Sequence, residues 1–202
     1  MRTILLFISL MACASMTAQE RNSIHLIERM RYVDPNPSFK ASVVVSSYYA
    51  NYNNNSVNTA ELISQFEEKL IKNDINPEDL EKDETGYISL ALGKEGMLYH
   101  YKTTSQKKLF KLISINTLGS SRLNYDYIAK LSPTAEGNLI KKAVEKARIR
   151  AQEMASTFDK KVGGVIKLQT NYDGGDWIRG IFRDTVIGEM VIDVQVDFEL
   201  LE

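Results

Sequence analysis

The longest helical pattern in the chain runs from Pro133 to Phe158. Its apolar residues recur at steps of four and three, the spacing that places side chains on one face of an α-helix; they are Ile140, Val144, Ala147, Ala151, Met154 and Phe158. A ladder of small residues at steps of four would let this helix lie close to a sheet or another helix; it consists of Ala143, Ala147, Ala151 and Ala155. We expect Ser132 to be the N-cap, Pro133 the first helical residue and Gly163–Gly164 the exit.

Alternation of apolar and polar residues predicts the strands. In the last of them, over 185–201, one face is apolar and the other polar, as in an antiparallel sheet with one wet face; the two faces carry Ile192, Val194, Val196 and Phe198 against Val191, Asp193, Gln195 and Asp197. Further strands are predicted over 22–32, 39–49, 87–92, 97–102, 122–131 and 165–172. The third and fourth of these flank Gly93–Gly96, which predicts a hairpin.

Two shorter helices complete the pattern. The first is capped by Asn58 or Thr59, and its expected buried residues are Leu62, Ile63, Phe66, Leu70 and Ile71. The second stretch, 105–116, suits either a short amphipathic helix or a strand. Ser105 as a cap and Gly119 after the end favour the helix.

The order strand-helix-strand-strand occurs twice and predicts an α+β fold. We expect antiparallel sheets packed by two to three helices. A chain of 202 residues can bury its own core as one domain of moderate size, and we expect that domain to span residues 19–202.

The first 18 residues predict export. Met1-Arg2 is a short basic start, residues 3–11 form an apolar run too short to span a bilayer, and small residues lead to Ala18. We interpret residues 1–18 as a signal peptide, which implies a periplasmic protein. The alternative is a lipobox, Leu10–Cys13, with Cys13 lipidated and the chain anchored to the outer membrane. No later run is long and apolar enough for a transmembrane helix.

Composition excludes several classes of protein. The formal net charge of -1 argues against a general nucleic-acid binder, which needs an excess of Lys and Arg. Cys13 is the single cysteine, so an intramolecular disulfide and a Cys/His zinc pattern cannot form. We expect no cofactor and no metal.

Four stretches, in their order along the chain, carry a family resemblance. They read VDPNPSFKASVVVSSYY, NTAELISQFEEKLIKNDINPEDLE, LIKKAVEKARIRAQEMASTFDKKVGGVIKL and VIDVQVDFELL. Together they resemble the SIMPL-domain family, the periplasmic immunogenic and outer-membrane-associated proteins of bacteria. Two departures are the order Asp34-Pro35, where the family has Pro-Asp, and Asn73–Ile75, where the family has a glycine. The resemblance implies an exported protein with no established catalytic centre, in a family where some members form large homo-oligomers.

Few residues suggest chemistry. His25 and His100 are the only histidines, and each lies in a predicted strand, where a catalytic role is uncommon. Asp173 and Asp176 flank two glycines and could offer carboxylates to calcium, but the ligand series of an EF-hand is missing and a tight turn is the better interpretation. Trp177 with Tyr172 and these two carboxylates is a candidate glycan-binding site. The alternative is an aromatic lid over the core.

The leading hypothesis from the sequence is an exported, non-enzymatic cell-envelope protein. It would act by protein–protein contact and self-assembly as a homo-oligomer, with a role in envelope integrity or a stress response. The second hypothesis is a periplasmic binding module for a glycan or another envelope ligand. It would use Trp177, Tyr172, Asp173 and Asp176, and with them the Asn- and Tyr-rich loop that contains Tyr48, Tyr49, Tyr52 and Asn51–Asn55. A third, without a suggested substrate, is a hydrolase that uses Asp173 and Asp176.

Overall fold

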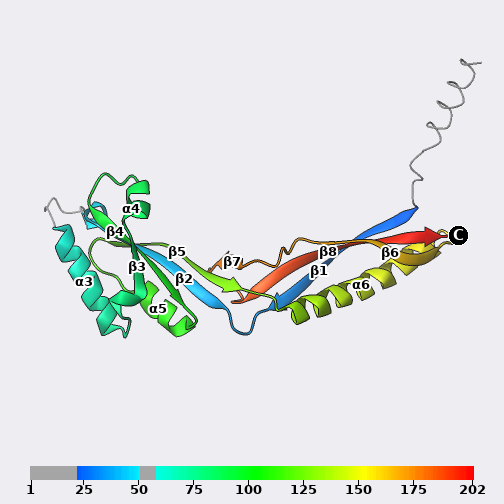
Figure 1. Ribbon diagram of the computed structural model, residues 1–202, viewed down its shortest axis with the longest axis horizontal. Helices are drawn as coiled ribbons and strands as arrows, with labels where there is room; N and C mark the ends of the chain where they lie inside the picture. The colour runs from blue at the N-terminus through cyan, green and yellow to red at the C-terminus, as the bar shows by residue number, and fades with distance from the viewer. Residues whose placement is uncertain (1–21, 51–57) are drawn as a thin grey trace, which may run out of the picture. The chain divides into compact units, whose positions relative to one another are not determined.

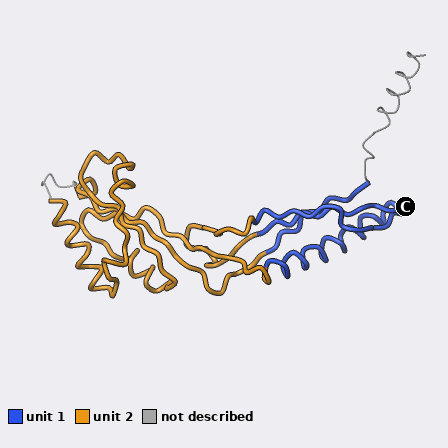
Figure 2. The backbone as a smooth tube through the Cα atoms, in the orientation of Figure 1, with its two compact units in different colours: residues 1–30, 136–172, 192–202 blue, residues 31–135, 173–191 orange. Residues whose placement is uncertain are grey.

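A computed structural model describes residues 22–50 and 58–202 (Figure 1). These residues form two compact units (Figure 2). Unit 1 combines the described residues up to Met30 with 136–172 and 192–202, and unit 2 combines 31–135 with 173–191. Both contain sheet and helix, and the predicted α+β class is confirmed. No helix in the described ranges is long and apolar enough to cross a membrane.

Unit 1 is built on a three-stranded sheet in the order β1-β8-β6. These strands are β1 (Ser23–Val33), β8 (Glu189–Leu201) and β6 (Lys161–Thr170), and β6 and β8 are antiparallel. The prediction for β8 is confirmed, because the four residues of its apolar face are fully buried: Ile192, Val194, Val196 and Phe198. Helix α6 (Pro133–Ser156) lies along this face, with the Arg148 guanidinium 4.8 Å from the centre of the Phe198 ring.

The contact face of α6 is the predicted alanine ladder, which is fully buried, with Leu139 at its start. The predicted apolar stripe is only partly correct. Met154 and Phe158, predicted to be buried, are 47% and 75% exposed. The reason is that β8 supplies large side chains to the interface, so the helix lies close and only small residues fit between helix and sheet. The larger apolar residues are displaced to the flanks of the helix.

The exit from α6 was also predicted at the wrong residues. Asp159 has a φ of 55°, and the Lys160 amide donates to the Ala155 carbonyl at 3.0 Å, which closes the helix before any glycine. Gly163 and Gly164 lie inside β6 instead. A Cβ on Gly163 would lie 3.1–3.2 Å from Glu199 and Leu201, so this glycine serves the close packing of β6 on β8.

Unit 2 is built on a five-stranded antiparallel sheet in the order β3-β4-β2-β5-β7. The strands are β3 (Leu80–Asp83), β4 (Gly96–Thr103), β2 (Ser38–Ser46), β5 (Ser120–Ala129) and β7 (Trp177–Gly180). The central strand, β2, is almost wholly buried, because helices cover both of its faces.

The helices of unit 2 cover opposite faces of this sheet. Helix α3 (Thr59–Lys72) places Phe66 against Tyr99, with ring centres 5.2 Å apart. Helix α4 (Glu84–Ser89) places Tyr87 in a cluster with Leu98. Neighbouring residues of a strand point to opposite faces, so α3 and α4 lie on opposite sides of β4. The remaining short elements are α2 (Ser47–Ala50), a 3-10 helix (Pro77–Asp79) and α5 (Gln106–Ser114).

Several predictions for unit 2 are confirmed. Asn58 is the N-cap of α3 and accepts a hydrogen bond from the Ala60 amide at 2.9 Å. The helix alternative for 105–116 is also confirmed, with Ser105 as the N-cap of α5. Ile71, predicted to be buried, is 62% exposed. It lies beside the buried residues of α3 in sequence but outside their face.

The predicted strand over 87–92 is wrong. These residues begin within α4, and the antiparallel partner of β4 on that side is β3. Asp83 starts the helix by accepting a hydrogen bond from the Gly86 amide at 2.7 Å. Strand β2 ends at Ser46, earlier than the predicted Tyr49, and the predicted strand from Thr185 begins only at Glu189.

Candidate functional site

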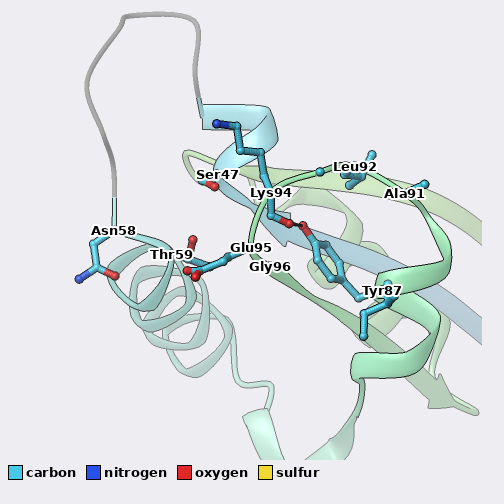
Figure 3. Close-up of a pocket in the computed structure, with 11 residues that line it drawn as sticks. Ser47, Asn58, Thr59, Tyr87, Ala91, Leu92, Lys94, Glu95 and Gly96 are labelled. Atoms are coloured by element: carbon cyan, nitrogen blue, oxygen red, sulfur yellow. Dashed lines mark hydrogen bonds between the residues drawn. The ribbon is translucent and has the colours of Figure 1, made fainter.

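A groove in unit 2 lies where α3 begins and α4 runs into β4 (Figure 3). We call it the α3–α4 groove. Its volume of ≈ 870 Å³ falls in the range typical of small-ligand sites. The groove is lined by polar and apolar residues, namely Ser47, Asn58, Thr59, Tyr87, Ile88, Ala91, Leu92, Gly93, Lys94, Glu95 and Gly96.

The floor of the groove is held by two buried hydroxyl groups. The Tyr87 hydroxyl donates to the Lys94 carbonyl at 2.6 Å (Figure 3), and the Ser46 hydroxyl donates to the Glu95 carbonyl at 2.9 Å. A Cβ on Gly96 would lie 2.6 Å from the Tyr87 ring, so a side chain at this position would force the ring away. The hydrogen bonds from Tyr87 and Ser46 therefore hold the backbone of Lys94 and Glu95 in place.

The loop above α4 has an unusual backbone. Ala91 has a φ of 53° and its amide donates to the Ile88 carbonyl at 3.0 Å, so it ends α4 in the left-handed conformation that glycine normally supplies. Gly93 follows with a φ of 64°. Left-handed backbone at a residue other than glycine is strained by about 1–2 kcal/mol, and such strain is often found at binding sites.

The opposite wall is the first turn of α3. Thr59 is the first helical residue and is 9% exposed, and its side chain lines the groove. In the described part of the chain, its hydroxyl has no hydrogen-bond partner. The ammonium of Lys94 and the carboxylate of Glu95 likewise have no ion pair among the described residues. Figure 3 shows Glu95 extending toward Thr59.

A second polar group lies in the middle of the unit 2 sheet. His100 Nδ1 is 2.9 Å from Ser42 Oγ, and His100 Nε2 is 3.2 Å from Asp83 Oδ2. Ser42 and His100 are direct partners across β2 and β4. Hydrogen bonding from the Gly86 amide, and then from His100, lowers the pKa of Asp83. The residue types match those of a Ser-His-Asp hydrolase, but Ser42 is buried and Asp83 is already engaged as the cap of α4.

His100 stands out in the sequence as one of two histidines, but no local signal marks Ser42 and Asp83 as its partners. The three residues lie far apart in the chain, and only the register of β2 and β4 brings the first two together. His25, the other histidine, pairs with Asp197 across β1 and β8 in unit 1. Both histidines therefore have carboxylate partners.

The predicted glycan site is spread over both units. Tyr172 is buried and belongs to unit 1, whereas Asp173, Asp176 and Trp177 belong to unit 2. Asp173 Oδ1 accepts a hydrogen bond from the Gly175 amide at 2.9 Å, which is the bond of an Asx turn. Asp176 pairs with Lys130 at 2.8 Å. The half-buried Trp177 begins β7, opposite Ala129 of β5.

Two cations of α6 are bound to the sheet of unit 1. Arg148 donates to the Gly163 carbonyl at 3.0 Å, and Arg150 pairs with Glu28 of β1. Cys13, the alternative lipidation site, and residues 51–55 of the Asn- and Tyr-rich loop lie outside the described residues.

Comparison with known proteins identifies a family. No curated protein and no solved structure matches the chain. Residues 39–189 match the family described as SIMPL, protein of unknown function (DUF541). The match covers more than half of the chain, including the α3–α4 groove, the Ser42–His100–Asp83 group and all of α6. The chain therefore belongs to the SIMPL family.

Proposed function

We propose that this chain is an exported, non-enzymatic protein of the cell envelope that acts by protein–protein contact and assembles with copies of itself through strand β6. The observation that carries the proposal is the outer edge of β6. This strand pairs with β8 on one side and is an edge of the unit 1 sheet on the other. An edge strand presents backbone N–H and C=O groups that can pair with another chain.

The side chains of β6 support this assignment. Val165, Ile166 and Leu168 are 40%, 38% and 44% exposed, although all three are large and apolar. Proteins often protect edge strands with bulges and lysines, and β6 has both between Lys161 and Lys167, where its register shifts. The last three residues, Leu168 to Thr170, pair regularly and carry no charge. This end of β6 is the most suitable part of the edge for pairing with a second copy.

Export and the absence of enzymatic activity rest on separate observations. The first 18 residues have the pattern of a signal peptide. The hydrogen bonds of Ser42, His100 and Asp83 serve to join β2, β4 and α4. Cell fractionation tests export, and the intact mass of the mature protein distinguishes cleavage after Ala18 from lipidation at Cys13.

The assembly is tested by the native mass of residues 19–202. We would measure it by size exclusion with light scattering, with and without detergent, over a wide range of concentration. We expect an oligomer that dissociates when Ile166→Lys and Leu168→Lys are combined. The matched control is Ile149→Lys, which alters an exposed apolar residue of α6 in the same unit. A monomer at every concentration would rule out the assembly.

The second candidate function is a binding module for a glycan or another envelope ligand. The specific observation in its favour is the α3–α4 groove rather than the residues around Trp177. Titration of the protein with cell-wall fragments, followed by the fluorescence of Trp177, tests the site predicted around Trp177. An unchanged emission spectrum at millimolar ligand would rule out binding at that site.

A further inference from the structure

We infer that the α3–α4 groove of unit 2 is a binding site for a neutral, polyhydroxylated ligand, namely a short stretch of glycan. This inference is independent of the proposed assembly, which concerns β6 of unit 1. It rests on three features of the groove: polar groups without partners, a balance of charge, and an apolar wall on a fixed support.

The first feature is a set of polar groups that have no partner among the described residues. The Thr59 side chain is the most informative, because the residue is 9% exposed overall and lines the groove. Its hydroxyl is not among the buried side-chain atoms of the described residues that lack a partner, so it is open to solvent and can donate to, or accept from, a ligand in the groove. The Lys94 ammonium adds a donor and the Glu95 carboxylate an acceptor.

The second feature is the balance of charge. The N-terminus of α3 carries partial positive charge, but Glu61 in the first turn and Glu95 across the groove oppose it. A phosphate or carboxylate would therefore meet a carboxylate, and a cation would meet Lys94. A sugar hydroxyl can accept from an ammonium and donate to a carboxylate at the same time. A neutral ligand with neighbouring hydroxyls therefore suits this lining best.

The third feature is the apolar wall. Ile88 is 75% exposed at the edge of the groove, and Leu92 lies half-buried beside it. The C–H faces of a sugar ring can pack on such side chains. The hydrogen bonds from Tyr87 and Ser46 hold the loop that carries Lys94 and Glu95. A ligand would therefore meet a largely preformed site, which reduces the entropy lost on binding.

The test is calorimetric titration of residues 19–202 with two neutral oligosaccharides, chitotriose and maltotriose. Inorganic phosphate and a short uncharged peptide serve as competing probes. We expect at least one oligosaccharide to bind, and Thr59→Val and Glu95→Gln each to weaken its binding by about tenfold, the effect of losing one hydrogen bond. The control Glu81→Gln, an exposed carboxylate of β3, should leave the affinity unchanged.

Two results would overturn the inference. One is the absence of binding by both oligosaccharides at millimolar concentration, including the case in which only phosphate or the peptide binds. The other is oligosaccharide binding that Glu95→Gln and Thr59→Val leave unchanged. Circular dichroism of each variant checks that α3 is intact. The titration is repeated with the combined Ile166→Lys and Leu168→Lys variant, which is designed not to assemble. Oligosaccharide binding by this variant would show that the groove binds its ligand whether or not the protein assembles through β6.

Discussion

Units 1 and 2 cover their sheets in opposite ways. In unit 1 the sheet supplies the large side chains and the helix supplies small ones, so β8 meets the alanine ladder of α6. In unit 2 helix and sheet both supply large side chains, as where Phe66 of α3 meets Tyr99 of β4. The first arrangement brings helix and sheet close together, whereas the second fills a thicker layer between them.

The difference determines which substitutions each unit should tolerate. A layer filled by large side chains is weakened when one is removed, because a cavity remains. An interface of alanines is weakened when a side chain is enlarged, because the helix must move away from the sheet. The same comparison explains the exposed apolar residues of unit 1. A single helix that lies close on β8 leaves side chains of the edge strand β6 uncovered.

Removing a large side chain should have the largest effect. Phe66→Ala in unit 2 is expected to lower the free energy of unfolding by about 3–5 kcal/mol, because Phe66 is fully buried against Tyr99. Urea unfolding followed by circular dichroism measures the change. The control is Phe110→Ala on α5, where the ring is partly exposed. Equal losses for the two variants would contradict the described packing of α3.

Enlarging an alanine should have the next effect. Ala147→Leu in unit 1 is expected to destabilise the protein by about 1–3 kcal/mol, because the added atoms have no space between α6 and β8. The same unfolding measurement applies, with Gln152→Leu on the exposed side of α6 as the control. If Ala147→Leu were neutral or stabilising, α6 could not lie on its alanine ladder.

A smaller change should sharpen the comparison within unit 1. The Arg148 guanidinium stacks on the Phe198 ring and donates to the Gly163 carbonyl. Arg148→Lys is expected to lose about 0.5–1 kcal/mol, because an ammonium lacks the planar face. Arg150→Lys is the matched variant, since an ammonium can still pair with Glu28. In thermal unfolding, Arg148→Lys should have a lower Tm than Arg150→Lys. The reverse order would contradict the stacking of Arg148 on Phe198.

The smallest effect should be seen only in acid and concerns unit 2. Hydrogen bonds from the Gly86 amide and from His100 lower the pKa of Asp83 in the folded chain. The stability that this carboxylate contributes is therefore complete above its unfolded pKa of about 3.9 and is lost as the pH falls through the lower folded value. Asparagine does not titrate, so the free energy of unfolding of Asp83→Asn should fall less than that of the wild type as the pH drops below about 4.

Stability measured against pH for Asp83→Asn and for Asp79→Asn tests this expectation. Asp79 lies in the neighbouring 3-10 helix and serves as the control carboxylate. Identical acid profiles for wild type and Asp83→Asn would show that the cap of α4 does not depend on the charge of Asp83.

Strong periodicity made part of this fold predictable from the sequence. Strand β8 alternates without interruption, and α3 has both an apolar face and a capping asparagine, so local signals and the observed packing agree. In α6 the helix and the close packing of its alanine ladder were predictable, but the exposure of Met154 and Phe158 was not. Apolar spacing alone favoured these two residues, whereas the large side chains of β8 select the alanines.

Other features depend on contacts that no local pattern contains. Strands β3 and β7 have four residues each, too few for alternation to be recognised. Helix α4 is set by the bond between Asp83 and Gly86, and its apolar residues also fit a strand. The α3–α4 groove joins the start of α3 to residues 87–96, and the register of β2 and β4 creates the Ser42–His100 pair.

The position of β8 also sets the order in which the chain can fold. The last strand to be synthesised is the centre of the unit 1 sheet, so neither β1 nor β6 has a partner in that sheet until residues 189–201 have left the ribosome. At about 5–20 residues per second, β1 waits roughly ten to thirty seconds for β8. During this delay the apolar face of β1, with Ile24, Leu26 and Met30, has no partner strand beside it. Such a nascent segment is a natural target for chaperones until β8 has been made.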